Sequence, residues 1–246
     1  MTPGAAEYLA AVDATWPAAA MKRVGPWTIR NGQGGGKRVS AATAETEVAG
    51  DDIALAEQEM LALDQPPLFM IRAGDERLDI LLAAKGYDVV DPVRVLAMPV
   101  AGLTDQPLPP VTAFEIREPL AIMAEIWAAG GVGPARLRVM DRAGNGTGIL
   151  LRWNEKPAGT GFVAVCGDIA MVHAVEVLPH QRRQGVAGRI MRAAAFWGAR
   201  QGARHMAVLC TEANGPANAL YSALGFEPAA QYHYRMKPTS GAAAYG

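Results

Sequence analysis

The sequence predicts an α/β or α+β chain made of two similar halves, and three observations support this class. Strand-like apolar runs alternate with helix-like segments along most of the chain. Half of the 246 residues are apolar, which is enough for a full core. Each half ends with a helix that closes on a glycine and an aromatic residue, Gly86-Tyr87 and Gly225-Phe226, and a strand follows.

The first half begins with a predicted hairpin, in which residues 27–30 and 37–44 flank the glycine-rich turn NGQGGG. This turn is not a Walker phosphate loop, because Asn31 and Arg38 stand where that motif needs Gly and Ser or Thr. The rest of this half is predicted to be a helix, a strand, a helix and a strand, at residues 51–63, 67–72, 76–87 and 93–100.

The second half is predicted from the same periodicities. Val186, Ile190, Ala194 and Trp197 recur at helical spacing. The predicted strands are residues 113–117, 148–153, 159–166, 169–179, 205–210 and about 231–237. The predicted helices are residues 119–130, 134–140, a helix from Val186, and 216–224.

A degenerate internal duplication is predicted from the likeness of the halves. Gly50 precedes Gly86 at nearly the spacing at which Gly185 precedes Gly225. The proline-rich stretch 102–114 is interpreted as a linker, which predicts domains 1–105 and 106–246.

Composition excludes several classes of protein. No apolar run approaches the roughly 18 residues of a membrane helix, and the N-terminus lacks a secretory pattern, so we expect a cytoplasmic protein without membrane contact. A mildly acidic pI makes nucleic acid a poor partner. Cys166 and Cys210 are expected to be free thiols, and no clustered metal ligands are present.

The stretch QRRQGVAGRI, residues 181–190, has two interpretations: an ordinary helix start or a phosphate site. The first amides of a helix lack internal partners, and the helix dipole places partial positive charge there. Between Glu176 and Glu212 the chain has six arginines and no acidic residue. This asymmetry predicts an anion at the corner.

The stretch NGPANALYSALGF, residues 214–226, is a loop that leads into a short helix ending at Gly225. Taken alone, this stretch favours a structural role for Tyr221, as a half-buried aromatic residue with its hydroxyl hydrogen-bonded, over a functional one.

The two motifs together, R-x-x-G-x-A at 182–187 and N-x-x-A-x-x-L-Y-x-x-x-G-F at 214–226, resemble the GCN5-related N-acetyltransferases (GNAT) over residues 113–238. The resemblance implies a twisted mixed sheet in which strands 169–178 and 205–210 splay apart and hold acetyl-CoA. It implies an N-acetyltransferase that acts on a primary amine, such as a small molecule or a protein N-terminus, without a metal. The alternative is a CoA-binding sensor or structural module without turnover. The acceptor and the oligomeric state are left open.

The resemblance also assigns roles by position. The backbone of Val175 and Val177 would pair with the pantetheine arm, Asn214 would touch it, and Tyr221 would protonate the leaving thiolate. The implied cofactor-binding residues are Val175, Val177, Arg182, Arg183, Gln184, Gly185, Val186, Ala187, Gly188, Arg189, Asn214 and Ala217.

The general base is expected to be Glu176 or His173, or a water relay that uses neither. Strand alternation places the two side chains on opposite faces, so at most one would point at the reacting centre. Residues 130–140, with Trp127 nearby, are the candidate acceptor contacts, although the stretch itself favours an ordinary helix and turn.

The first half is expected to be non-catalytic. Its corresponding corner, EVAGDD, places Glu47, Asp51 and Asp52 where a phosphate would bind, and these carboxylates would repel it. Leu82 stands where Tyr221 stands in the second half. We therefore expect a GNAT-like unit that packs against the active half and helps to shape the acceptor pocket.

Overall fold

The computed structural model describes residues 2–238, which divide into two compact units. Unit 1 comprises the N-terminal residues up to Pro17, Val95–Cys210 and Asn214–Ala230. Unit 2 comprises Ala18–Arg94, Thr211–Ala213 and the residues from Gln231 onward.

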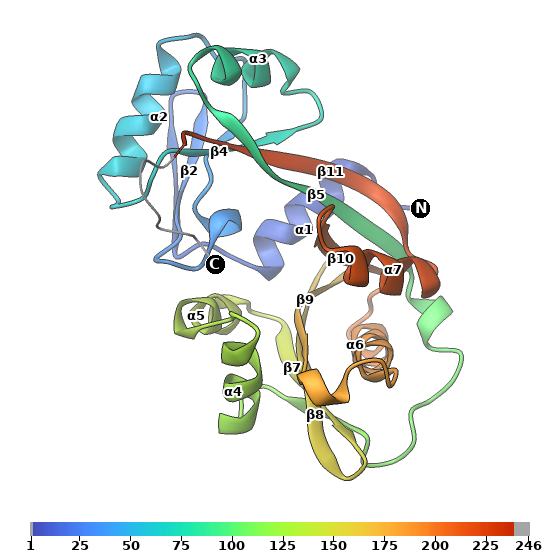
Figure 1. The fold of residues 1–246 in the computed structure, drawn as a ribbon. Coiled ribbons are helices and arrows are strands. Elements are labelled where there is room, and N and C mark those ends of the chain that lie inside the picture. Colours follow the sequence, from blue (N-terminus) through green and yellow to red (C-terminus); the bar gives the residue numbers. More distant parts are fainter. Residues whose placement is uncertain (1, 239–246) are drawn as a thin grey trace. The chain divides into compact units, whose positions relative to one another are not determined.

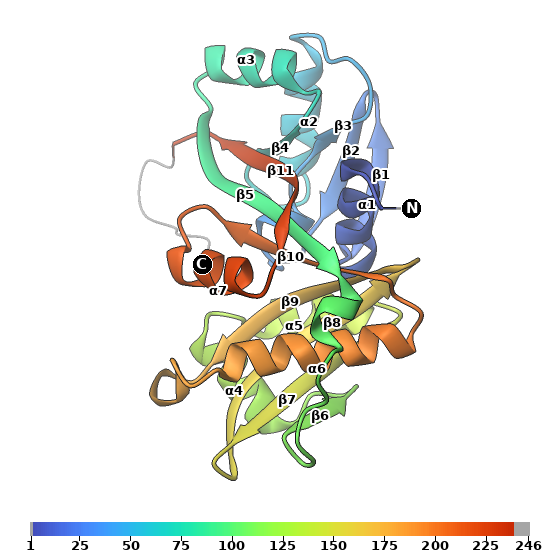
Figure 2. The same ribbon diagram turned by 90° about the vertical axis from the view of Figure 1, so that its right-hand side faces the viewer.

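Unit 1 holds a mixed sheet with helices on both faces (Figures 1 and 2). Its strand order is β11-β5-β10-β9-β8-β7-β6, and β9 and β10 are parallel. The strands are β6 (Ala113–Ile116), β7 (Gly146–Trp153), β8 (Lys156–Cys166), β9 (Ile169–Val177) and β10 (His205–Thr211), with parts of β5 (Asp88–Pro99) and β11 (Glu227–Met236). The helices are α1 (Ala5–Thr15), α4 (Ala121–Ala129), α5 (Pro134–Arg142), α6 (Val186–Arg200) and α7 (Gly215–Ala223).

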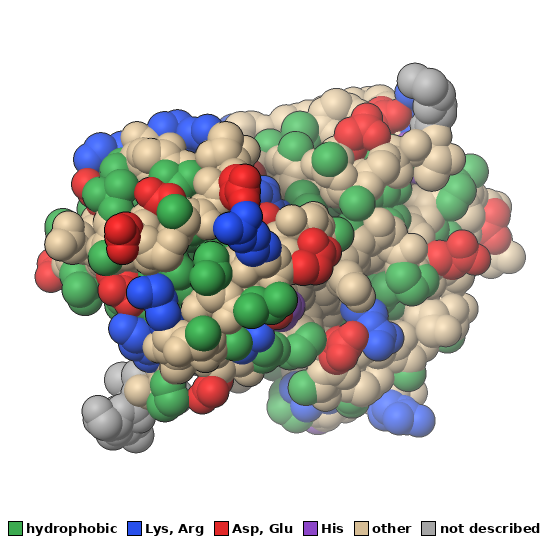
Figure 3. Space-filling model, turned by 90° about the horizontal axis from the view of Figure 1, so that it is seen from above, with side chains coloured by type: hydrophobic (Ala, Val, Ile, Leu, Met, Phe, Trp, Pro, Cys, Tyr) green, Lys and Arg blue, Asp and Glu red, His purple; other side chains and the backbone are tan. Residues whose placement is uncertain are grey.

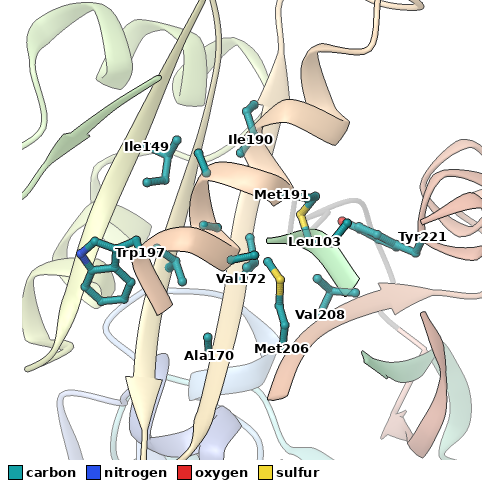
Figure 4. Close-up of a cluster of buried hydrophobic side chains, with 14 of the residues drawn as sticks. Leu103, Ile149, Ala170, Val172, Ile190, Met191, Trp197, Met206, Val208 and Tyr221 are labelled. Carbon is teal, nitrogen blue, oxygen red and sulfur yellow. The ribbon is translucent and has the colours of Figure 1, made fainter. Parts of the chain in front are cut away.

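Helix α6 covers one face of this sheet, and α1, α4 and α5 lie on the other (Figure 1). The predicted stripe on α6 is confirmed, because Val186, Ile190, Ala194 and Trp197 are all buried. Glycines on β8 let the helix approach closely: a Cβ on Gly161 would lie 2.8 Å from Ile190 Cγ2. Figure 4 shows this core. The Tyr221 side chain extends from α7 towards Met191 and Leu103, and its hydroxyl group is the part nearest to them.

Unit 2 has a separate core around Trp27, Phe69 and Tyr87. Its elements are β1 (Ala20–Val24), β2 (Trp27–Asn31), β3 (Thr43–Ala44), α2 (Asp52–Leu61), β4 (Leu68–Arg72) and α3 (Glu76–Ala84). β1, β2 and β3 form an antiparallel sheet, and β4 pairs antiparallel with β11 over Tyr232–Met236. In the view of Figure 3, acidic and basic side chains lie side by side rather than in separate patches.

The predicted antiparallel pairing of residues 27–30 with 37–44 is confirmed only at its far end, where Trp27 pairs with Ala44 and Thr28 with Thr43. The predicted tight hairpin around NGQGGG is wrong, and β2 also pairs with β1 across Gly25-Pro26. The Gln65 side chain bonds the backbone at the start of the glycine run: its Nε2 donates to Arg30 O at 2.8 Å, and Gly32 N donates to its Oε1 at 2.6 Å. These bonds replace ladder bonds, and residues 37–39 form a 3-10 turn instead of a strand.

The predicted boundary at residues 105/106 and the predicted linker also differ from the compact units. Residues 95–105 belong to unit 1, since Val100 and Leu103 are buried in its core and Val100 N donates to Arg204 O at 2.9 Å. The last strand of each half is divided between the units, so a cut between the halves does not separate two complete folds. Among the described helices, none is long and apolar enough to cross a membrane.

Candidate active site

A gap opens in the sheet of unit 1 between β9 and β10. Their parallel pairing runs from Ile169–His205 to Val172–Val208, whereas β9 continues to Val177. Leu178 N donates to Ala158 O on β8 at 3.0 Å, so by alternation the backbone groups of Val177 face the opposite edge. The splayed strands expected from the family resemblance are thus present: beyond Val172 this edge of β9 is not paired with β10, and the Val177 carbonyl accepts a side-chain bond from Arg182 Nε.

A β-bulge in β9 reorients the residues next to this gap. Thr160 pairs with Glu176 and Phe162 with His173, so β9 carries one extra residue, and Ala174 takes a left-handed φ of 49°. The Ala174 carbonyl accepts a bond from Trp127 Nε1 at 2.8 Å. The prediction that His173 and Glu176 lie on opposite faces is therefore wrong: the extra residue places both on the face of α1 and α4.

The two candidate bases nevertheless lie in different environments. His173 is only 4% exposed; it shares a 3.0 Å hydrogen bond with Thr15 Oγ1 and packs on Trp16 at 4.9 Å. Glu176 is half-buried, and a Cβ on Gly130 would lie 2.2 Å from its Cδ. Burial raises the pKa of the Glu176 carboxyl, against the opposing charges of Arg182 and Arg136. A carboxylate of raised pKa suits proton uptake near neutral pH.

Tyr221 is the candidate proton donor at this site. It is 7% exposed and packs edge-on against Phe226, with ring centroids 5.7 Å apart. Burial raises its pKa, and the charges of Cys210 and Glu176 raise it further, so the phenol stays protonated at neutral pH.

The N-terminus of α6 is the candidate anion site. Gly185 is its N-cap in the left-handed conformation, with φ 76°, and no side chain caps the helix. A cavity of about 330 Å³ opens here, and Gly185, Gly188, Arg189 and Arg192 line it from the α6 side. Unpaired amides, the helix dipole and two guanidinium groups therefore surround this cavity.

The arginines and glutamine of this corner are held by local contacts. Arg182 Nε donates to Val177 O at 3.1 Å. Arg189 Nη1 donates to Gln184 O at 2.9 Å, and its guanidinium lies 4.0 Å from the Trp153 ring centroid. Trp153 Nε1 in turn donates to Gln184 Oε1 at 2.7 Å. Sequence reasoning missed Trp153, because nothing in the β7 pattern distinguishes it from an ordinary exposed strand end.

The remaining predicted residues have mainly structural contacts. Asn214 is the N-cap of α7, and its side chain accepts a bond from Ala217 N at 3.2 Å. Arg183 is exposed with a left-handed φ of 62°. Trp127 is fully buried, so in this structure it supports the bulge rather than an open acceptor surface. In the described residues no group of three His, Cys, Asp or Glu could hold a metal ion.

Alanine substitutions at two glycines of the corner are expected to change the stability of the protein in opposite directions. In Gly185→Ala, the left-handed φ is unfavourable and the new Cβ would lie 2.6 Å from Arg189 Nη1, so the melting temperature should fall, at a cost of about 1–2 kcal/mol. In Gly188→Ala, the nearest atom is 3.9 Å away and the site is helical, so stability should rise by about 1 kcal/mol. Thermal melts measure both changes.

Both substitutions should weaken CoA binding, because each adds a methyl group to the lining of the cavity. Calorimetric titration of the two variants tests this, and wild-type affinity in a more stable Gly188→Ala would contradict an anion site at this corner.

A mixed sheet that splays beside an uncapped helix N-terminus is an arrangement that can bind an anionic ligand at a strand-to-helix corner. Residues 117–226 match the model of the acetyltransferase (GNAT) family, and this region belongs to the GNAT superfamily. It is 26% identical over 242 residues to an uncharacterized N-acetyltransferase, YobR, of Bacillus subtilis (strain 168), covering 94% of this chain and 97% of the relative.

Two solved structures share the fold over nearly the whole chain. A GCN5-related N-acetyltransferase from Kribbella flavida has a TM-score of 0.68 at 20% identity, with 97% of this chain and 98% of that chain covered. A tandem GNAT protein from the clavulanic acid biosynthesis pathway has a TM-score of 0.61 at 16% identity, with 93% and 87% covered.

Proposed function

We propose that unit 1 transfers an acetyl group directly from acetyl-CoA to a primary amine. The observation that supports this proposal is the bulge in β9, which turns the Glu176 side chain to the face of α4 on the part of β9 that β10 leaves unpaired. Membership in the acetyltransferase family supports the reaction class.

The proposed reaction needs one proton acceptor and one proton donor. The amine nitrogen attacks the thioester carbon, a C–N bond forms, and the C–S bond breaks. Glu176 takes the amine proton directly or through a water, and Tyr221 gives its phenolic proton to the departing thiolate. The protonated Glu176 then releases its proton to solvent and the tyrosinate regains one from solvent, so the protein ends in its starting state. His173 is a less suitable base because Thr15 and Trp16 enclose it.

The cofactor is proposed to lie along the part of β9 that is not paired with β10 and across the corner, where it would displace the Arg182 side chain from the Val177 carbonyl. The backbone groups of Val175 and Val177 would bond the pantetheine arm as an added strand does. The amides at residues 185–188 would bond the pyrophosphate, with charge from Arg189. Within the family this substrate is the expected one.

Unit 2 is proposed to be a degenerate, non-catalytic GNAT-like unit. At its corresponding corner Asp51 is the N-cap of α2, and Asp52 in the first turn accepts a bond from Ala49 N at 2.8 Å. These carboxylates occupy the position that a phosphate would take, and their negative charge would repel it. Leu82, at the position of Tyr221, is fully buried in the core of unit 2.

Steady-state release of free thiol tests the proposed function. The full-length protein, acetyl-CoA and a panel of primary amines should give amine-dependent thiol release. Calorimetry should show one CoA bound per chain, since only one corner is free of carboxylates. Saturable CoA binding without thiol release from any amine would instead support a sensor or structural module.

A further inference from the structure

A short segment ahead of β6, Gln106–Pro109, forms the second wall of the cavity at the α6 N-terminus; we call it the strap. Gln106, Pro107, Leu108 and Pro109 face the cavity opposite Gly185, Gly188 and Arg189, and Leu224 at the end of α7 completes the lining. The sequence suggested a linker here, but the strap belongs wholly to unit 1.

Both ends of the strap are fixed to unit 1. Upstream, Arg192 Nη1 donates to Leu103 O at 3.3 Å, and the same guanidinium forms an ion pair with Asp105. The pKa of Asp105 is lowered, chiefly by its bond from Arg192. Downstream, Arg152 N donates to Thr112 O at 2.8 Å, where β6 is about to begin.

The strap itself is stiff and largely apolar. Pro107 and Pro109 restrict φ and have no amide to donate, and Leu108 packs against the core of unit 1. Its conformation therefore costs little entropy to maintain once the ends are fixed.

The two walls of the cavity differ in chemistry. The α6 wall is cationic, with Arg189, Arg192 and the helix amides, whereas the strap wall offers proline and leucine surface. Phosphate groups need the first kind of surface, and the sugar and base of a nucleotide gain from the second. A cavity of about 330 Å³ lies within the usual range for small-molecule sites.

We propose that the strap holds the phosphorylated nucleoside end of CoA against α6, and that the Asp105–Arg192 ion pair tethers it. Asp105 is thus a positioning residue that acts through the strap, not a catalytic one. The proposal rests on the proposed function, since it takes CoA as the ligand of this corner.

The test compares Asp105→Asn with a matched control, Glu115→Gln. Glu115 forms an ion pair with Arg200 at the other end of α6, and both carboxylates are about half exposed, so each variant removes one similar surface pair from the same helix. Calorimetry measures the affinity of each variant for two ligands. Acetyl-CoA carries the nucleotide end and acetyl-pantetheine lacks it, so a change seen only with acetyl-CoA comes from contacts with that end. Asp105→Asn should weaken acetyl-CoA binding about two- to fivefold, as expected for one tethering ion pair, and leave acetyl-pantetheine binding unchanged. Glu115→Gln should change neither.

Amide hydrogen exchange provides a second readout that does not depend on activity. Exchange at Gln106 and Leu108 should slow when CoA binds to the wild type, and should be faster in free Asp105→Asn than in free Glu115→Gln. If the wild type binds CoA but the strap gains no protection, or if Asp105→Asn binds CoA as the wild type does, the strap proposal is wrong and the proposed function stands. If the wild type binds no CoA, both are wrong.

Discussion

Tyr221→Phe should lower kcat at least about a hundredfold while the Kd for acetyl-CoA stays at its wild-type value. The substitution removes only the phenolic oxygen, so the ring remains packed against Phe226 and the core is preserved. What is lost is the proton for the departing thiolate, which has to leave as the free anion. Steady-state thiol release and calorimetry on the same preparation separate the chemical step from binding.

Tyr8→Phe is the matched control for this experiment. Tyr8 on α1 is also a buried tyrosine of unit 1 whose pKa is raised by burial, but it lies on a helix that contributes no group to the proposed reaction. It should keep wild-type kcat. Equal losses in both variants would mean that any missing buried hydroxyl disturbs the site, and Tyr221 would then not be the acid.

Glu176→Gln should lower kcat by about a hundredfold and remove the acid limb of the pH–rate profile. In the wild type this limb should lie above the ordinary range of a glutamate, because burial raises the pKa of Glu176. Activity requires the ionised carboxylate as proton acceptor, so it falls as the pH falls through that raised pKa. The rate measured from about pH 5 to pH 9 gives the profile.

The same variant should be more stable than the wild type at neutral pH. A carboxyl whose pKa is raised by folding favours the folded state only while it is protonated, and this contribution is lost as the pH rises through the folded pKa. At neutral pH Glu176 is therefore a destabilising charge, which the neutral glutamine removes. Glu125→Gln, on the exposed side of α4, should change neither activity nor melting temperature. A pH profile that keeps its acid limb in Glu176→Gln would exclude this residue as the base.

The sequence was most informative where local chemistry and periodicity agree. The α6 stripe from Val186 to Trp197 could be predicted because burial on one helix face imposes its spacing. The glycine at 185 could be predicted as a special helix start, because few other residues adopt a left-handed N-cap.

Long-range contacts determined the features that could not be predicted. No local sequence pattern predicts the bulge at Ala174. The bulge depends on the register between β8 and β9 and on the hydrogen bond that Trp127 of α4 donates to the Ala174 carbonyl. Residues 37–44 look like a strand paired with 27–30 across a turn, yet Gln65, far along the chain, bonds the backbone of Arg30 and Gly32. The proline content at 102–114 indicated a linker. Proline predicts a stiff backbone, but it does not predict whether that backbone packs against the rest of the protein.

The division of β11 between the units has a consequence for the order of synthesis. In unit 2, β4 pairs with Tyr232–Met236, which are among the last described residues of the chain. The ribosome makes Ala18–Arg94 of unit 2 first, so the edge of β4 lacks its native neighbour until residues 232–236 have been made. An unpaired strand edge is a template for wrong pairing, and pairings distant in sequence form slowly. During translation this edge is therefore open to wrong pairing, and a chain that terminates before residue 232 would have a unit 2 that lacks this strand.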